Sequence, residues 1–254
     1  MAIIKSLIIA FSTYSKIPTP KIEWEEKNMK YAICFFPLIG AIIGLVWLLW
    51  IYLAERFGVS DLFKASVATL IPIIITGGIH LDGFCDITDA FSSWQPKEKK
   101  LEILKDPHVG AFAIIGCGCY LLAYLGIMAE VEFDKMALAI AAGFVLSRAF
   151  SALALVHFKS ARPKGMLDTF AQNSHKKIVS TVSEFYIIIA FLLIAFVSLK
   201  LCLYTALACV LAFWLYHHLA YKKLGGTTGD MAGWFLQICE LAIPYFVIIL
   251  GGLL

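Results

Sequence analysis

Long apolar runs recur along the whole of this 254-residue chain, and they constrain its fold more than any other feature. In hydrocarbon every backbone N–H and C=O group must be hydrogen-bonded internally, which leaves only helices and closed barrels. The runs are too long and too uniformly apolar for barrel strands, so each is predicted to be a helix. Seven of them, at about 20 residues each, are long enough to cross a bilayer: 31–54, 62–81, 109–129, 136–157, 183–199, 201–220 and 231–254.

The sequence therefore predicts an all-α fold, a polytopic helical membrane bundle with about seven transmembrane helices. Hydrophobic residues make up 61% of the chain and charged residues 15%, which excludes an ordinary cytosolic enzyme and a disordered chain. Short polar turns at 130–135 and at Lys200 predict antiparallel neighbours. We expect a single integral membrane domain over 1–254, made of a cytoplasmic or interfacial N-terminal segment, 1–30, and the helical bundle, 31–254.

Lysine and arginine are distributed unevenly between the two sides of the predicted bundle. Sixteen of them fall on one side, in the N-terminal segment and in loops 82–108, 158–182 and 221–230, whereas four fall on the other side. By the positive-inside rule the basic side is cytoplasmic, so we expect the N-terminus inside and the C-terminus outside an inner (cytoplasmic) cell membrane. The net charge of +3, spread over short clusters, gives no indication of nucleic-acid binding.

Three aspartates follow the second apolar run at helical spacing. Asp82, Asp86 and Asp89 stand at i, i+4 and i+7, which places three carboxylates along one face of a helix. Like charges repel there unless a cation lies among them, and Mg²⁺ takes oxygen ligands and shares its shell with substrate phosphates. We therefore expect these aspartates to be metal ligands and catalytic residues. The alternative is a solvated helix start, with acidic side chains near the positive end of the helix dipole.

Further polar groups lie on the same predicted side of the membrane. Asp106 is a candidate fourth ligand or general base, Lys105 a candidate phosphate contact, and His108 a candidate base or phosphate donor. The alternative is that Asp106 and the proline after it only mark the start of a helix. His80 is a candidate substrate contact, or else only a partner for a backbone carbonyl or a carboxylate.

A glycine-rich turn precedes the last apolar run. Gly225, Gly226 and Thr228 lie just before Asp230, and glycines allow backbone N–H groups to approach an anion at a helix N-terminus. The turn predicts a phosphate site, or a second metal bound through Asp230, whereas the alternative is a plain turn between two spans. In loop 158–182, Arg162 is a candidate contact for an anionic substrate, although an inside-positive loop has the same composition.

Two charged residues, Arg148 and Glu240, lie within apolar runs. Charge at membrane depth is costly, so we expect these residues to pair with each other or to face the cavity of the site, with plain packing as the alternative.

Carboxylates, basic groups and a glycine turn on one membrane face together indicate phosphoryl transfer from a diphosphate donor to a hydroxyl acceptor. In such a reaction a metal neutralises the diphosphate, an aspartate accepts the proton of the hydroxyl, and Lys or Arg holds the remaining oxygens.

Four strings along the chain resemble one known family. They are 17–20, 76–83 with Asp86 and Asp89, 105–106 with Gly110, and 225–230. Their order and residues are similar to those of the cobalamin synthase family, the adenosylcobinamide-GDP ribazoletransferases. The resemblance implies a Mg²⁺-dependent inner-membrane enzyme that joins adenosylcobinamide-GDP to α-ribazole or its 5′-phosphate and releases GMP, in nucleotide-loop assembly of cobalamin biosynthesis.

The resemblance also implies roles for particular residues. Asp82, Asp86 and Asp89 match the acidic motif of the family, Asp106 its second acidic segment, and Asp230 its closing glycine-rich motif. His108 stands where an arginine is common, so it is expected to be at most a substituted phosphate contact. The implied partners are the two small-molecule substrates and the lipid bilayer. Other enzymes of the corrinoid pathway and the oligomeric state are left open.

Two other classes of membrane protein compete with this interpretation. A CDP-alcohol phosphotransferase also places aspartates at helical spacing on the cytoplasmic side, but its Asp-Gly pair is followed soon by Ala-Arg, which this chain lacks. A transporter would line a path through the midplane of several spans with polar residues, whereas here the polar residues crowd at one face.

Overall fold

The structure is a computed structural model that describes residues 2–23, 25–163 and 165–252. Within these residues it is helical and contains no strand, so the predicted all-α fold is confirmed. Seven helices run along the length of the molecule: α3 (Phe36–Arg56), α4 (Asp61–Thr76), α7 (Ala111–Ala129), α8 (Lys135–His157), α10 (Lys176–Val197), α11 (Leu199–Leu219) and α12 (Gly229–Gly252). The last two residues of the predicted span 231–254 lie outside the described residues.

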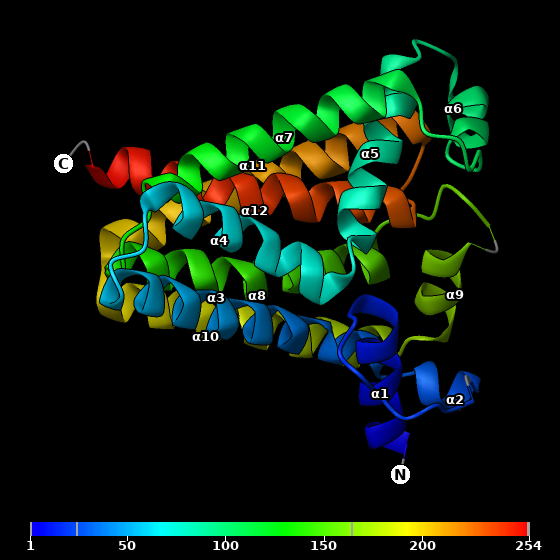
Figure 1. Cartoon of the computed structure of the whole chain (residues 1–254). Helices are drawn as coiled ribbons and strands as arrows, with labels where there is room; N and C mark the ends of the chain where they lie inside the picture. Colours follow the sequence, from blue (N-terminus) through cyan, green and yellow to red (C-terminus); the bar gives the residue numbers. More distant parts are fainter. Residues whose placement is uncertain (1, 24, 164, 253–254) are drawn as a thin grey trace.

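Shorter helices gather at one end of this bundle, the end at which the chain begins (Figure 1). They are α1 (Ala2–Tyr14), α2 (Glu26–Met29), α5 (Ile79–Ser92), α6 (Lys97–Ile103) and α9 (Met166–Asn173). The chain ends at the opposite end of the bundle, and the connections that carry most of the lysines and arginines all lie with the short helices (Figure 1). We call this the loop end. That this end faces the cytoplasm stays a prediction.

Among the described residues, six helices are each long and apolar enough to span a membrane, and a bent pair of helices, α4 and α5, adds a seventh if the pair is one span. The predicted uninterrupted span over 62–81 is therefore wrong in its last five residues, 77–81. The cause is the pair Gly77 and Gly78, which adopt left-handed backbone conformations with φ of +67° and +78°. Gly77 ends α4, and α5 leaves at an angle of 95° to it, across the loop end of the bundle (Figure 1).

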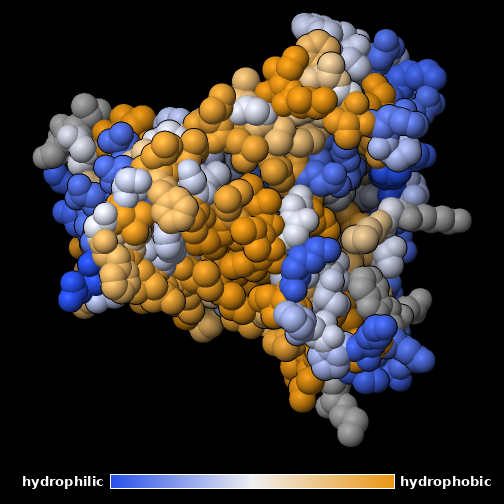
Figure 2. Space-filling model, in the orientation of Figure 1, coloured by the Kyte–Doolittle hydropathy of each residue, from blue (hydrophilic) through white to orange (hydrophobic). Residues whose placement is uncertain are grey.

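On the face seen in Figure 2, the apolar side chains of the long helices form a belt, with polar side chains gathered at its two ends. Inside the belt, α8 is the most buried of the candidate spans. Two glycines of α3 let it approach α8 closely, because a Cβ atom on Gly40 would lie 2.1 Å from the Phe144 carbonyl oxygen and one on Gly44 would lie 2.6 Å from that of Ala141. Close backbone approach at small residues is the usual way that helices pack in membranes.

The two charged residues predicted within the spans form a buried ion pair. Arg148 Nη1 of α8 lies 2.6 Å from Glu240 Oε1 of α12, and both side chains are at most 2% exposed. Arg148 Nη1 also donates to the Phe144 carbonyl, and Ser147 Oγ donates to Glu240 Oε1. The expectation that these residues pair with each other is confirmed.

Candidate active site

Close contact between α5 and α12 brings the separate acidic motifs together. A Cβ atom on Gly83 would lie 2.8 Å from the Asp230 carbonyl oxygen, and one on Gly233 would lie 3.0 Å from the His80 carbonyl oxygen. Only glycine permits this approach, because backbone atoms cannot move aside as a flexible side chain can. The contact places Asp82 and Asp86 beside Asp230, although about 150 residues separate them in the chain.

A first cavity, of about 310 Å³, is lined by most of the predicted catalytic groups; we call it the carboxylate cavity. Asp82, Asp86 and Asp89 line it from α5, so the predicted common helix face is confirmed. Asp106 and His108 line it from the loop after α6. This loop lies against α5 at Gly110. A Cβ atom added to this glycine would lie only 2.0 Å from Asp89 Oδ1.

Asp106 and His108 form a local pair within that loop. The backbone N–H of His108 donates to Asp106 Oδ1 over 3.0 Å, and His108 Nδ1 lies 2.6 Å from the same oxygen. These two hydrogen bonds lower the pKa of the Asp106 carboxyl. Both side chains are exposed, so the pair lies on the water side of the carboxylate cavity.

The carboxylate cavity has the chemistry of a site for a hard cation. The negative charge on Asp86 is repelled by Asp82, Asp230 and Asp89. Asp230 Oδ2 is buried and accepts no hydrogen bond within the described part of the chain. In the same residues no three His, Cys, Asp or Glu side chains are close enough to hold a metal ion by themselves. A cation among these carboxylates would therefore need water or substrate phosphate oxygens to complete its shell, as is common for Mg²⁺. The assignment of these aspartates as metal ligands stays a prediction.

A second cavity, of about 420 Å³, carries the predicted phosphate contacts; we call it the basic cavity. Lys105 and Arg162 line it together with Thr228 and two acidic residues, Asp168 and Asp230. Arg162 Nη1 lies 3.9 Å from Asp230 Oδ2, so the guanidinium reaches the boundary with the acidic groups. The basic cavity thus lies beside the acidic groups of the carboxylate cavity. A diphosphate with a bound cation needs such neighbours, because basic residues bind its oxygens and carboxylates bind the cation.

The glycine-rich turn is placed differently from the phosphate cradle that the sequence predicted. The N–H groups of Gly225 and Gly226 donate to the carbonyls of Tyr221 and Ala220, so they close the end of a π-helical turn, Ala220–Leu224. A Cβ atom on Gly226 would lie 2.4 Å from the Lys159 carbonyl oxygen, so close packing accounts for this glycine. The backbone N–H groups of Gly225 and Gly226 are therefore already hydrogen-bonded within the turn. Of the turn residues, Thr228 lines the basic cavity, while its Oγ1 accepts from the Met231 N–H and starts α12.

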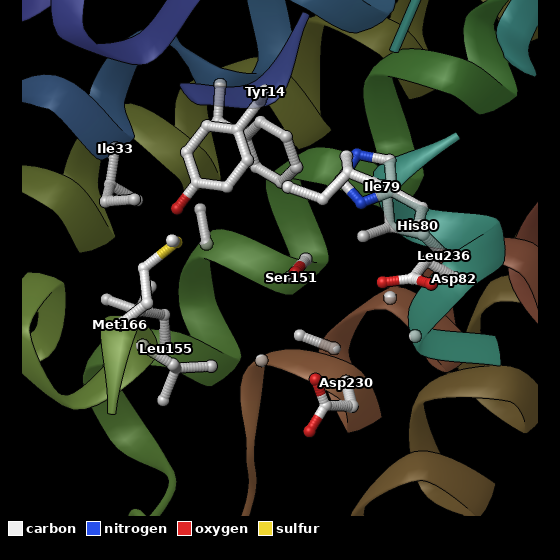
Figure 3. Close-up of a pocket in the computed structure, with 17 residues that line it drawn as sticks. Tyr14, Ile33, Ile79, His80, Asp82, Ser151, Leu155, Met166, Asp230 and Leu236 are labelled. Atoms are coloured by element: carbon white, nitrogen blue, oxygen red, sulfur yellow. The ribbon is translucent and has the colours of Figure 1, made fainter. Parts of the chain in front are cut away.

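A third cavity, of about 320 Å³, opens beside Asp82 and Asp230; we call it the apolar cavity (Figure 3). His80 lines it, as do residues that the sequence analysis did not single out, such as Tyr14 and Ser151. Tyr14 comes from the N-terminal segment, in which the sequence analysis singled out only the string 17–20, as part of the family resemblance. Ser151 follows the buried Arg148 by three residues on α8, one helical turn along the same face, and this spacing is the one sequence signal that could have found it.

The likeness of this chain to known proteins covers the whole site. The family model for cobalamin-5-phosphate synthase matches residues 6–248, which include every candidate site residue. The chain belongs to the cobalamin-5-phosphate synthase family. Three relatives named adenosylcobinamide-GDP ribazoletransferase support this, from Lachnoclostridium phytofermentans (49% identical, 99% of this chain and 96% of the relative), Treponema denticola (34%, 94% and 95%) and Clostridium perfringens strain 13 (31%, 93% and 94%). No solved structure matches this chain.

Membership in the cobalamin-5-phosphate synthase family confirms the resemblance expected from the motifs. Together with the apolar helices, it identifies the chain as a membrane-embedded transferase of cobalamin biosynthesis. It also decides against the CDP-alcohol phosphotransferase and transporter alternatives. The roles of individual site residues stay predictions, now supported by their common position around three adjoining cavities.

Proposed function

We propose that this enzyme joins adenosylcobinamide-GDP to α-ribazole or its 5′-phosphate, with release of GMP, at the cytoplasmic face of the membrane and with Mg²⁺. The relatives carry the name of this reaction. The single observation that carries the proposal is that Asp230 lines both the basic and the apolar cavity and adjoins Asp82, which lines the carboxylate cavity. A donor diphosphate, its cation and an acceptor hydroxyl therefore have adjoining places.

The residues of the basic cavity hold the donor in this proposal. Lys105 and Arg162 bind the diphosphate oxygens, and Thr228 supplies a further polar contact. A Mg²⁺ ion held among Asp82, Asp86 and Asp89, with water and substrate oxygens completing its shell, would supply positive charge that neutralises the diphosphate. Arg162 lies close enough to Asp230 for its positive charge, in the basic cavity, to attract the negative charge of Asp230, which lies beside Asp82 of the carboxylate cavity.

The acceptor hydroxyl reacts where the cavities meet. One of the site aspartates accepts its proton, and the oxygen forms a bond to the phosphorus that carries cobinamide while the bond to GMP breaks. Asp82 and Asp230 border the apolar cavity as well, so they are the aspartates within reach of an acceptor bound there. Asp106 lines the carboxylate cavity from the loop after α6, paired with His108.

The cytoplasmic orientation is supported by charge. Of the described lysines and arginines predicted to lie outside the spans, fifteen belong to segments at the loop end, against four at the other end. This imbalance favours the loop end as the inner side. Both water-soluble substrates would then reach the three cavities from the cytoplasm.

A product assay tests the proposal. Purified chain in liposomes, given adenosylcobinamide-GDP, α-ribazole and Mg²⁺, is expected to release GMP and to form a cobalamin, and EDTA is expected to stop both. Failure of the complete mixture to release GMP would remove the proposed reaction. Full activity in EDTA would remove only the magnesium requirement.

A matched pair of variants tests the site. Asp82→Asn is expected to abolish GMP release while the circular dichroism spectrum is kept. Asp134→Asn is the control, because Asp134 caps α8 at the other end of the bundle and Asn caps a helix as well as Asp does. Equal rates for the two variants would show that the Asp82 carboxylate has no catalytic or metal-binding part.

A further inference from the structure

A fourth cavity, of about 110 Å³, lies at the end of the bundle opposite the loop end, where α8, α11 and α12 meet. We call it the lysine cavity, because Lys135 of α8 and Lys200 of α11 both line it. Gly251 of α12 lies between these two helices, since a Cβ atom added to it would lie 3.4 Å from Met136 Cε and 3.6 Å from Leu201 Cδ2. The fold therefore brings two lysines from distant parts of the chain to one place.

The lysine cavity offers hydrogen-bond donors that have no acceptor. Within the described residues neither lysine makes an ion pair, the Tyr204 hydroxyl makes no hydrogen bond, and no acidic side chain lines the cavity. The acidic residue nearest in sequence, Asp134, uses its Oδ1 to accept the Met136 and Ala137 N–H groups at the start of α8. Ammonium and hydroxyl donors that share a cavity without an acceptor fit a bound anion.

The surface beside the lysine cavity is apolar. Leu138 follows Lys135 by three residues and Leu203 follows Lys200 by three, so each leucine lies one turn further along the same face of its helix. Leu138 is 44% exposed and Leu203 61% exposed. Because α8 and α11 both begin at this end of the bundle, the leucines lie deeper in the apolar belt than the lysines. Positive charge and exposed apolar surface thus follow each other in the order in which a lipid presents its headgroup and its chains.

We propose that the lysine cavity binds the phosphate of an anionic phospholipid, whose acyl chains lie against Leu138 and Leu203. The ammonium groups of Lys135 and Lys200 donate to the phosphate oxygens, and the Tyr204 hydroxyl is a third donor. The cavity is well below the size of ordinary small-molecule sites, about 300–1,000 Å³, so it holds the phosphate and leaves the rest of the lipid outside.

A shared cavity distinguishes this site from lysines that merely extend toward the headgroups. Single lysines near the ends of membrane helices commonly reach the interface in that way. Here two lysines from two helices line the same cavity, together with a hydroxyl group. The site lies at the opposite end of the bundle from the three cavities of the candidate active site, so it does not depend on the proposed reaction.

Native mass spectrometry of the full chain in detergent micelles, titrated with phosphatidylglycerol, tests the inference. Lys135→Gln or Lys200→Gln is expected to weaken binding of one lipid about fivefold, and the two together about thirtyfold, as for the loss of one and two lysines near a phosphate. The two lysines changed to arginine together are expected to keep the affinity. Arg56→Gln is the control, because Arg56 is exposed at the same end of the bundle and does not line the cavity.

A second variant keeps the test valid if the glutamine variants do not fold. Gly251→Leu fills the cavity from α12 without changing any charge, and it is expected to weaken binding of phosphatidylglycerol at least tenfold. An affinity unchanged from the wild type in the folded double glutamine variant, or in folded Gly251→Leu, would overturn the inference. An equal loss of affinity in Arg56→Gln would also overturn it, because the attraction would then belong to the whole surface.

Two other ligands separate a lipid site from a site for soluble phosphate. Phosphatidylcholine is expected to bind at least tenfold more weakly than phosphatidylglycerol, because its choline group brings a positive charge beside the lysines. Glycerophosphoglycerol, the same headgroup without acyl chains, is also expected to bind at least tenfold more weakly, because it buries no apolar surface against Leu138 and Leu203. If the chain-free headgroup bound as tightly as the lipid, the cavity would be a site for a soluble phosphodiester. If phosphatidylcholine bound as tightly, the cavity would not select an anion. Either result would make the inference wrong.

Discussion

The buried pair of Arg148 and Glu240 allows a quantitative test of the fold. In Glu240→Gln the shape of the side chain is kept, but the guanidinium of Arg148 is left with the neutral acceptors Phe144 O and Ser147 Oγ. The pair is at most 2% exposed, so water cannot compensate for the lost charge. Breaking a buried pair from one side costs about 3–5 kcal/mol, and we expect the free energy of unfolding to fall by this amount.

A double variant shows whether the cost comes from the unpaired charge. Arg148→Met with Glu240→Leu removes both charges and keeps the volume, so it is expected to recover most of the stability lost in Glu240→Gln. Reversible unfolding by sodium dodecyl sulfate in mixed micelles, followed by circular dichroism, gives the free energies. Glu184→Gln, at an exposed position of α10, is the control and is expected to change stability by less than about 0.5 kcal/mol. A loss below about 1 kcal/mol in Glu240→Gln, or a double variant no more stable than Arg148→Met, would refute the reasoning.

Three further predictions concern the site and the topology. Gly83→Ala is expected to separate α5 from α12, to cost about 1–3 kcal/mol by overpacking, and to lower GMP release more than tenfold, whereas Gly126→Ala, with no atom within 4 Å of its added Cβ, leaves both unchanged. His108→Ala is expected to raise the pKa of Asp106 part of the way to its usual range, measured by carboxyl-carbon NMR, because the backbone hydrogen bond remains. Reporters fused to the two ends of the chain are expected to lie on opposite sides of the membrane, since the termini lie at opposite ends of the bundle; two reporters on one side would contradict the count of seven crossings.

The apolar runs predicted the helices well because hydropathy decides which segments enter a bilayer. The bend after α4 was missed for the same reason, since 62–81 is apolar on both sides of Gly77 and Gly78. Two adjacent glycines permit a left-handed turn but do not demand one. The turn is fixed by tertiary contacts, such as that of Gly77 with Lys16, whose Cε would lie 2.2 Å from an added Cβ.

The candidate site was predictable where its residues share one helix and less so where it depends on packing between helices. The spacing of Asp82, Asp86 and Asp89 is a property of one helix, so their common face followed from the sequence. The approach of Asp230 depends on contact between α5 and α12, which no local pattern encodes. Gly225 was misinterpreted because a glycine that ends a helix and a glycine that cradles phosphate look alike in a sequence.

The bend at Gly77 and Gly78 also has a consequence for the surrounding lipid. With 16 residues, α4 is about 24 Å long, which is about 6 Å less than the hydrocarbon thickness of a typical bilayer. A short span is accommodated by local thinning of the bilayer around it. We therefore expect the bilayer to be thinner beside α4 than around the longer spans, so that α5 begins near the local headgroup level.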